Sequence, residues 1–376
     1  MSPVRRIAAI ALGAALLAAA ADGAAAPGIP RTPDGYLLAV PPYRFEFPRD
    51  HASHPGYRTE WWYYTGHLGA ADRTFGFELT FFRVGIDRSR ENDPSRWAFH
   101  TLHFAHFALT DLEGGRFFFD EKLGRPGLGL AGADSSTLHA WIDDWSVRLD
   151  GDGVTHLLRA ASGTFGIELA LAPQKPPVLH GENGVSRRAE GLGRASHYYS
   201  LTRLAGPGTV SLEGRDHPVD GLVWMDHEFG SNQLAEDQEG WDWFSIQLDD
   251  GRDLMLYRMR LEDGGTDPHS SGTLIERDGR ARHLPREAFT IEARGEWKSP
   301  NTSAVYPAGW TLRVPSADLV LEVTPNVVDQ ELVTGGTVNV HYWEGSVRAS
   351  GRSGGRPLAG RGYVELTGYA GDVPGF

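Results

Sequence analysis

The chain has 376 residues, enough for two or three domains of ordinary size. Aromatic residues make up 11% and glycines number 47, a mixture that favours short strands joined by tight turns over helices. The net charge of −13 argues against a general nucleic-acid binder, and the absence of cysteine excludes disulfides, thiolate metal sites and cysteine nucleophiles.

Residues 1–26 have the pattern of an export signal. Arg5 and Arg6 supply the positive end, residues 7–21 the apolar stretch, and residues 24–26 small side chains suited to cleavage. An apolar run of about fifteen residues is short for a membrane span, which needs about twenty, so a retained anchor is the less favoured alternative. We expect a periplasmic or secreted protein with no stable membrane span after signal cleavage.

From Tyr36 onward, the pattern of apolar residues alternates as in β-strands. Phe75, Phe77, Leu79 and Phe81 share one face of a predicted strand, because successive side chains of a strand point to opposite sides. Turn signals rich in Gly and Asp separate such runs throughout the chain. The sequence therefore predicts an all-β fold of antiparallel sheets, closed as barrels or packed as a sandwich.

Several segments recur in the same order, which indicates an internal duplication. The pairs are residues 61–68 with 241–248, 167–173 with 319–325, 197–199 with 341–343, and 224–226 with 363–365. We infer two β domains of one ancestry, spanning residues 36–234 and 235–376, with the boundary in the polar stretch 233–240. A barrel of about eight strands has room inside for one small ligand.

An aromatic cluster opens the first predicted domain. On a strand, Trp61 and Tyr63 point one way, and Glu60 and Trp62 the other. The four residues either close a barrel end, with Glu60 bonded to backbone or to an arginine, or form the wall of an apolar ligand site. The second repeat carries three residues at the matching positions: Trp241, Asp242 and Trp243.

Asp226, His227 and Glu228 come directly after an apolar strand. Trp224 and Asp226 share a face, and Glu228 continues that row. Burial raises the pKa of a carboxyl, so Asp226 is a candidate general acid, with a solvated turn or a structural ion pair as the alternative. Its predicted neighbours are His197, Tyr199 and Asp242.

Three histidines, His100, His103 and His106, invite a metal interpretation. On a strand, His100 and His106 share a face about 20 Å apart, whereas His103 faces the opposite side, so they do not converge on one ion. The sequence therefore predicts no metal and no cofactor.

Five segments resemble the family of carotenoid 1,2-hydratases (hydroxyneurosporene synthases), which includes exported proteins named for AttH. They are residues 60–63, 175–181, 196–199, 224–230 and 240–244, and the likeness runs from about residue 36 to 370. The resemblance implies two lipocalin-like β-barrel domains. AttH is encoded beside ABC-transporter genes, so the resemblance also implies an ABC transporter permease as a partner.

The hydratases add water to the terminal double bond of an acyclic carotenoid without a cofactor. Matched motif to motif, the resemblance implies Asp226 as proton donor, with His197, Tyr199 and Trp224 beside it. The hydratases carry a His-x-Trp and a Tyr-x-Asp pair here, so Tyr199 and Trp224 exchange the two aromatic types.

Three functions stay open on the sequence. The first is an exported lipocalin-like protein that binds an apolar or amphiphilic molecule, such as a lipid, terpenoid or carotenoid, in an aromatic cleft. The second is a hydratase-like lyase that adds water to a polyene by acid catalysis, and the third is a structural or docking protein. The predicted ligand-binding residues are Glu60, Trp61, Trp62, Tyr63, His227, Glu228, Trp241, Asp242 and Trp243.

Overall fold

The computed structural model describes residues 28–88, 100–232 and 234–371. The predicted export signal lies outside these residues. The described chain is almost entirely β structure, with three short 3₁₀ helices: η1 (Arg49–His51), η3 (Arg286–Ala288) and η4 (Pro315–Ala317). No helix in these ranges is long and apolar enough to cross a membrane.

The first sheet has 13 antiparallel strands. They are β1 (Thr59–Gly69), β2 (Thr74–Gly85), β3 (Thr101–Asp111), β4 (Arg116–Gly124), β5 (Ala131–Ala133), β6 (His139–Ile142), β7 (Trp145–Leu149), β8 (His156–Ser162), β9 (Phe165–Pro173), β10 (Val178–Leu179), β11 (Val185–Arg187), β12 (Ala195–Leu212) and β13 (Arg215–Gly230). Their order is β4-β3-β2-β1-β13-β12-β9-β8-β7-β6-β5, and β10 and β11 both pair with β12.

The second sheet has ten antiparallel strands. They are β14 (Gln238–Leu248), β15 (Asp253–Leu261), β16 (Ser271–Ile275), β17 (Ala281–Leu284), β18 (Thr290–Ala293), β21 (Trp310–Val314), β22 (Leu319–Pro325), β23 (Glu331–Val333), β24 (His341–Ser353) and β25 (Arg356–Leu366). Their order is β17-β16-β15-β14-β25-β24-β22-β21-β18, with β23 on β24. A separate ribbon joins β19 (Glu296–Lys298) and β20 (Val305–Pro307).

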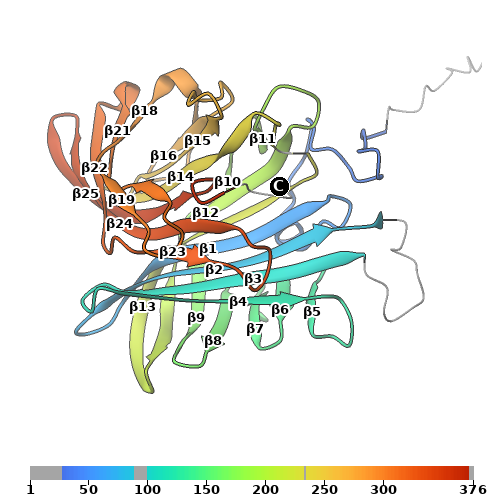
Figure 1. Cartoon of the computed structure of the whole chain (residues 1–376), viewed down its shortest axis with the longest axis horizontal. Helices are drawn as coiled ribbons and strands as arrows, with labels where there is room; N and C mark the ends of the chain where they lie inside the picture. Colours follow the sequence, from blue (N-terminus) through green and yellow to red (C-terminus); the bar gives the residue numbers. More distant parts are fainter. Residues whose placement is uncertain (1–27, 89–99, 233, 372–376) are drawn as a thin grey trace, which may run out of the picture.

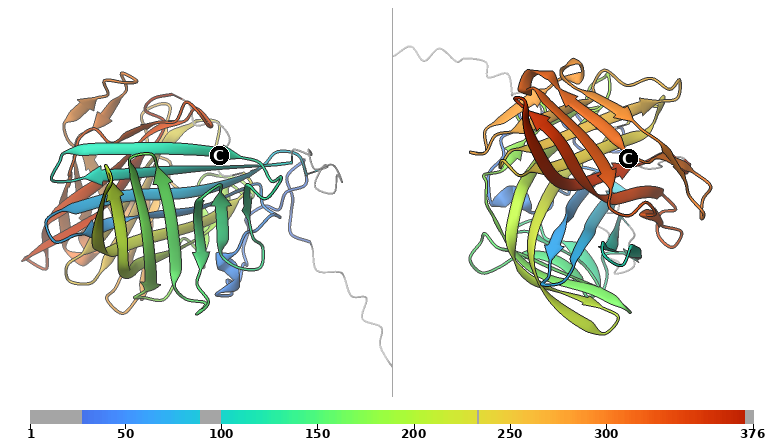
Figure 2. Two further views of the ribbon diagram at one scale, coloured as in Figure 1. Left: turned by 90° about the horizontal axis from the view of Figure 1, so that it is seen from below. Right: turned by 90° about the vertical axis from the view of Figure 1, so that its left-hand side faces the viewer.

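The first sheet curls until β4 comes against β6, which makes it a nearly closed barrel (Figure 2). A large apolar core fills this barrel, and a second core fills the concave side of the second sheet. The two sheets also pack against each other, with β1 beside β25 and β2 beside β24 (Figure 1). A third buried cluster, which includes Tyr63, Trp224 and Trp243, lies between them.

The two sheets repeat one arrangement, which confirms the predicted fold class and its internal duplication. β13 lies between β1 and β12, just as β25 lies between β14 and β24. The register repeats as well, because Tyr63 is opposite Asp226 in the first sheet and Trp243 is opposite Glu365 in the second. Residues at matching positions of the two repeats therefore occupy equivalent places.

Both faces of β1 are buried, which explains its run of aromatic residues. Trp62 and Tyr64 point into the core of the first barrel, whereas Tyr63 belongs to the cluster between the sheets. The sheets approach closely at Gly76 on β2, where an added Cβ would lie 2.5 Å from the hydroxyl oxygen of Tyr363 and 2.8 Å from Cβ of Ser346. Glycine at this position lets the sheets meet.

Candidate functional site

A cleft opens between the two sheets beside the third core cluster. The cleft is narrow, with a cavity volume of about 80 Å³. Both sheets contribute to its walls, so it exists only because the repeats pack together. Its aromatic lining includes Trp61, Tyr63, Phe82, Phe104, Trp241 and Trp243.

Asp226 lies at the buried side of this cleft, on β13. Its Oδ1 accepts hydrogen bonds from the hydroxyl of Ser200 and from the indole N–H of Trp224, which is 2.6 Å away. Its Oδ2 accepts one from the hydroxyl of Tyr198, 2.7 Å away. Burial raises the pKa of Asp226 to about 7, although these donors act in the opposite direction. Near neutral pH the carboxyl can therefore both hold and release a proton.

Glu365 is a second carboxyl of the cleft, on β25. Its Oε2 accepts a hydrogen bond of 2.8 Å from the indole N–H of Trp241, and its side chain is half-buried. Burial raises the pKa of Glu365 to about 7, and the nearby carboxyls of Glu228 and Asp226 add to that rise. Two carboxyls with a pKa of about 7 thus line the same cleft.

A buried ion pair lies at the side of the cleft formed by the loop after β11. The guanidinium of Arg188 is 2.5 Å from Oε1 of Glu228, which also accepts a bond of 2.5 Å from Ser196. The same guanidinium lies 4.2 Å above the ring of Tyr257 and thus fastens the loop to both sheets. Glu228 is therefore a paired carboxylate, in contrast to Asp226 and Glu365.

Two further carboxyls lie deeper between the sheets. The hydroxyl of Tyr63 donates to Oε1 of Glu344 at 2.7 Å, and Thr80 donates to Oε1 of Glu78. The second oxygen of each carboxyl is buried without a hydrogen-bond partner. Burial raises the pKa of both groups well above the ordinary value. Burial therefore favours the protonated form of Glu78 and Glu344.

A buried histidine connects to Asp226 through one hydroxyl. Nε2 of His180 is 2.6 Å from the hydroxyl oxygen of Ser200, and Nδ1 is 2.8 Å from that of Thr273. Burial lowers the pKa of His180 to about 3, so the ring is neutral. When Asp226 is protonated it can donate to Ser200, which can then donate to His180. The network thus accommodates both protonation states of Asp226.

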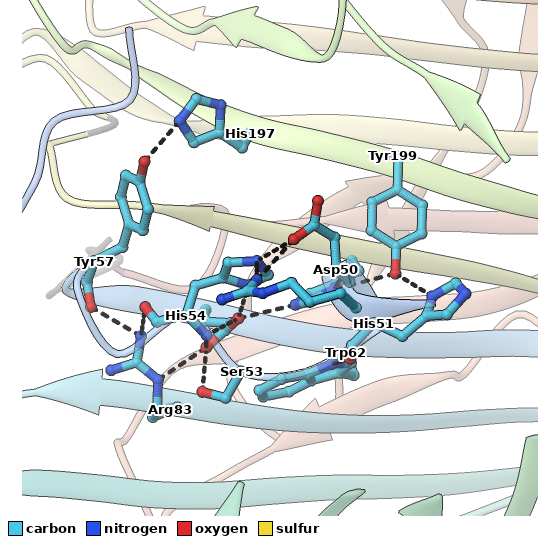
Figure 3. Close-up of polar contacts among 12 residues, drawn as sticks. Asp50, His51, Ser53, His54, Tyr57, Trp62, Arg83, His197 and Tyr199 are labelled. Carbon is cyan, nitrogen blue, oxygen red and sulfur yellow. Dashed lines mark hydrogen bonds and ion pairs between the residues drawn. The ribbon is translucent and has the colours of Figure 1, made fainter. Parts of the chain in front are cut away.

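A separate polar network occupies the other face of the first sheet, at one end of the barrel (Figure 3). Glu60 is fully buried, and its Oε2 accepts bonds from Arg83 at 2.9 Å and Ser53 at 2.7 Å. Its Oε1 lies 2.9 Å from Nδ1 of His54 and 3.0 Å from Nε2 of His227. This network holds the segment around η1 against the barrel wall.

His197 and Tyr199 belong to this second network. The hydroxyl of Tyr199 is 2.6 Å from Nδ1 of His51 and 3.1 Å from Nδ1 of His227 (Figure 3). The hydroxyl of Tyr57 is 3.0 Å from Nε2 of His197. Both residues face away from the cleft.

The ligand atoms of His54, Glu60 and His227 lie within 4.8 Å of one another, close enough to surround a metal ion. Each of them nevertheless has hydrogen-bond partners within the network, and the guanidinium of Arg83 already balances the charge of Glu60. These contacts fit a buried ion pair with two hydrogen-bonded histidines, and they fit a metal site equally well.

The comparisons with known proteins give the family of the chain. The model of the AttH-like family matches residues 38–369. The chain belongs to the AttH-like family. Its resemblance to AttH, drawn from the sequence motifs, is thereby confirmed. The comparison with curated proteins gave no match.

Solved structures extend this likeness. A protein of Nitrosomonas europaea described as an AttH is 35% identical, with a TM-score of 0.81 over 89% of this chain and 99% of that one. Kievitone hydratase from Nectria haematococca is 15% identical, with a TM-score of 0.67 over 91% and 99%. CghA is 12% identical, with a TM-score of 0.53 over 84% and 90%. The last two likenesses show a shared fold alone.

The AttH-like fold divides the predicted site residues between two faces of the first sheet. The cleft face of the first sheet carries Asp226 and Trp224 and the predicted ligand-binding residues Trp61, Tyr63 and Glu228, and β14 of the second sheet adds Trp241 and Trp243 from across the cleft. The barrel face carries Glu60, Trp62, His227, His197 and Tyr199. The structure therefore does not bring His197 or Tyr199 beside Asp226, because paired residues share a face and Asp226 is opposite Ser200.

Asp242 does not line the cleft either. It bonds to Arg258 and accepts a 3.0 Å bond from Tyr369, beside the core of the second sheet. The sequence patterns did not indicate Tyr198 and Glu365 as cleft residues, nor Ser200 as a partner of Asp226. A signal for Glu365 was present, since residues 363–365 match residues 224–226 in the duplication.

Proposed function

We propose that this AttH-like protein binds an apolar or amphiphilic small molecule in the cleft between its sheets. The observation that supports this most is the aromatic lining contributed by both repeats, with the carboxyls of Asp226 and Glu365 among the lining residues. Aromatic faces provide large apolar contact areas, and protonated carboxyls can donate hydrogen bonds to a neutral polar group. A flat or slender ligand with a few neutral oxygen atoms suits this lining.

Val338→Trp tests the binding site. Val338 is half-buried and lines the cleft, so an indole there would occupy ligand space. We expect Nile red, a neutral apolar dye, to bind at least ten-fold more weakly to this variant, because binding would have to displace the ring. Fluorescence titration measures the affinity. The control is Val154→Trp on an exposed turn. Equal affinities for both variants and the unchanged protein would place the dye elsewhere.

We also propose that the protein is exported to the periplasm and that an ABC transporter permease is its partner there. Both proposals rest on the basic and apolar pattern of residues 1–26 and on the family. Cell fractionation of the full chain, compared with a version carrying Arg5→Glu and Arg6→Glu, tests the export. Extraction of the purified protein with organic solvent, followed by mass spectrometry, identifies the ligand that it carries.

A second candidate function is the addition of water to a carbon–carbon double bond of the bound molecule. Asp226 favours it, since a carboxyl with a pKa of about 7 in an aromatic pocket can act as a general acid. The surrounding indole and phenol faces, Trp224 and Tyr63 among them, can stabilise a carbocation. Kievitone hydratase, whose name describes a hydration, shares this fold.

Asp226→Asn is expected to abolish such turnover while dye binding persists, because the amide has a similar shape but no proton of suitable acidity. Turnover is measured as incorporation of ¹⁸O from labelled water into kievitone and into an acyclic carotenoid. Asp220→Asn, at an exposed position on the same strand, is the matched control. Turnover that survives in Asp226→Asn would remove Asp226 from the role of acid.

A further inference from the structure

The duplication places two carboxyls at equivalent positions of the two repeats, and both line one cleft. Asp226 is opposite Tyr63 on β1, and Glu365 is opposite Trp243 on β14. Each carboxyl accepts a hydrogen bond from an indole N–H, that of Trp224 for Asp226 and that of Trp241 for Glu365. The cleft therefore has a carboxyl on each of its two sides.

The surroundings of the two carboxyls differ in a way that assigns different tasks. Asp226 is only 4% exposed and has three hydrogen-bond donors, whereas Glu365 is half-buried and accepts one bond from Trp241. Water in the cleft can reach the glutamate more easily than the aspartate. Because both carboxyls have a pKa of about 7, it is this difference in access to water that distinguishes them.

We propose that Glu365, in its ionised form, is the general base that takes a proton from the water molecule added to the ligand. The proposal rests on the second candidate function. Asp226 gives its proton to one alkene carbon, and the other carbon becomes a cation. As water forms the new C–O bond, one of its O–H bonds breaks and the proton passes to Glu365. Transfer of that proton back to Asp226 through solvent restores the site, and the sum is addition of one water.

The charges nearby allow this division. The carboxylate of Glu228 is held by Arg188 at 2.5 Å, so it does not compete for the proton. Glu344 accepts its bond from Tyr63 behind the cleft wall. A negative charge on Asp226 raises the pKa of Glu365, so ionisation of one carboxyl disfavours ionisation of the other.

The test uses Glu365→Gln in the full chain, with Glu168→Gln at an exposed position as the matched control. The first readout is carboxyl ¹³C NMR of Asp226 against pH, which needs no substrate. We expect its apparent pKa to fall by about one unit in Glu365→Gln and to stay unchanged in Glu168→Gln, because a neighbouring negative charge is removed. An unchanged titration of Asp226 in Glu365→Gln would overturn the pairing.

The second readout is ¹⁸O incorporation into kievitone and into an acyclic carotenoid. We expect turnover to fall at least 100-fold in Glu365→Gln while Nile red binding is retained. Unimpaired turnover by this variant would overturn the role as base. A third outcome is that the unchanged protein binds the dye but hydrates neither compound, and that Asp226 titrates identically in the unchanged protein and in Glu365→Gln. In that case the role of Glu365 as base is wrong, whereas the proposed binding function is retained. If the unchanged protein does not bind Nile red, that result would contradict the proposed binding function instead.

Trp241→Phe is a second variant that tests the role of Glu365 even if Glu365→Gln does not fold. It removes the indole N–H that stabilises ionised Glu365, so we expect the pKa of Glu365 to rise and the pH profile of turnover to shift to more alkaline values. A merely structural role of Glu365 would lower turnover without moving the profile.

Discussion

Replacing Arg83 by methionine is expected to lower the free energy of unfolding by about 3–5 kcal/mol. The guanidinium bonds Oε2 of Glu60 at 2.9 Å and the backbone carbonyls of His54 and Tyr57 at 3.1 and 2.8 Å. Its removal leaves the fully buried carboxylate of Glu60 without its arginine and the carbonyl oxygen of Tyr57 without this donor, whereas that of His54 still accepts a bond from the N–H of Tyr57. Urea denaturation followed by tryptophan fluorescence measures the loss.

The matched control is Arg159→Met, whose ion pair with Glu168 is exposed and should contribute about 0–1 kcal/mol. The double variant Glu60→Gln with Arg83→Met should lose less than Arg83→Met alone, because no uncompensated charge remains. A loss below 1 kcal/mol in Arg83→Met would show that this network does not hold the η1 segment in place.

The stability of the protein is expected to be greatest near pH 6 to 6.5 and to fall on both sides. Burial lowers the pKa of seven histidines to about 3 or 4, so below about pH 6.5 the unfolded chain takes up more protons than the folded one. They are His51, His67, His103, His106, His156, His180 and His197. Stability is therefore lost as the pH falls through this range.

The buried carboxyls act in the opposite direction. Asp226 and Glu365, with pKa values of about 7, and Glu78 and Glu344, whose pKa values burial raises well above the ordinary value, keep protons that the unfolded chain releases near pH 4. Between pH 4 and 6.5 the more numerous histidines outweigh these four groups. As the pH rises above 6.5 the histidines of the unfolded chain lose their remaining protons, so the buried carboxyls increasingly determine the pH dependence and stability falls.

Glu344→Gln isolates the alkaline part of this dependence. The amide keeps the acceptor for Tyr63 but cannot ionise. At pH 8.5 we expect the variant to exceed the unchanged protein by at least about 1.4 kcal/mol, the value of one pKa unit, and to equal it near pH 4. Urea denaturation between pH 4 and 9 measures both limbs, with Glu168→Gln as control. Parallel curves for Glu344→Gln and the unchanged protein would contradict the neutral state of Glu344.

The fold was predictable because its signals are local or repeated. The alternation of Phe75, Phe77 and Leu79 needs only the two-residue period of a strand. The duplication needed no structure, since four pairs of segments recur in the same order. The predicted pairing of residues 224–226 with 363–365 appears in the structure as equivalent places on β13 and β25.

The site was predictable only along single strands. Alternation places Trp224, Asp226 and Glu228 on one face of their strand, and Trp61 and Tyr63 on one face of theirs. In the structure these five residues meet in one region. Which face of β12 joins them depends on register, because a shift by one residue exchanges the two faces. A bulge between Leu201 and Leu204 changes the register of β12 against β13, and a sequence pattern does not reveal it.

The last strand of each repeat is a central one, and this arrangement has a consequence for synthesis. β13 joins β1 to β12, and β25 joins β14 to β24, although each is the final strand of its repeat. A chain that ends before Arg356 lacks the strand that unites the two halves of the second sheet, together with Glu365. Assembly of the second repeat must therefore wait until nearly the whole chain has left the ribosome. A product truncated there also lacks Glu365 and Thr367 of the cleft wall, so the cleft is complete only when β25 is present.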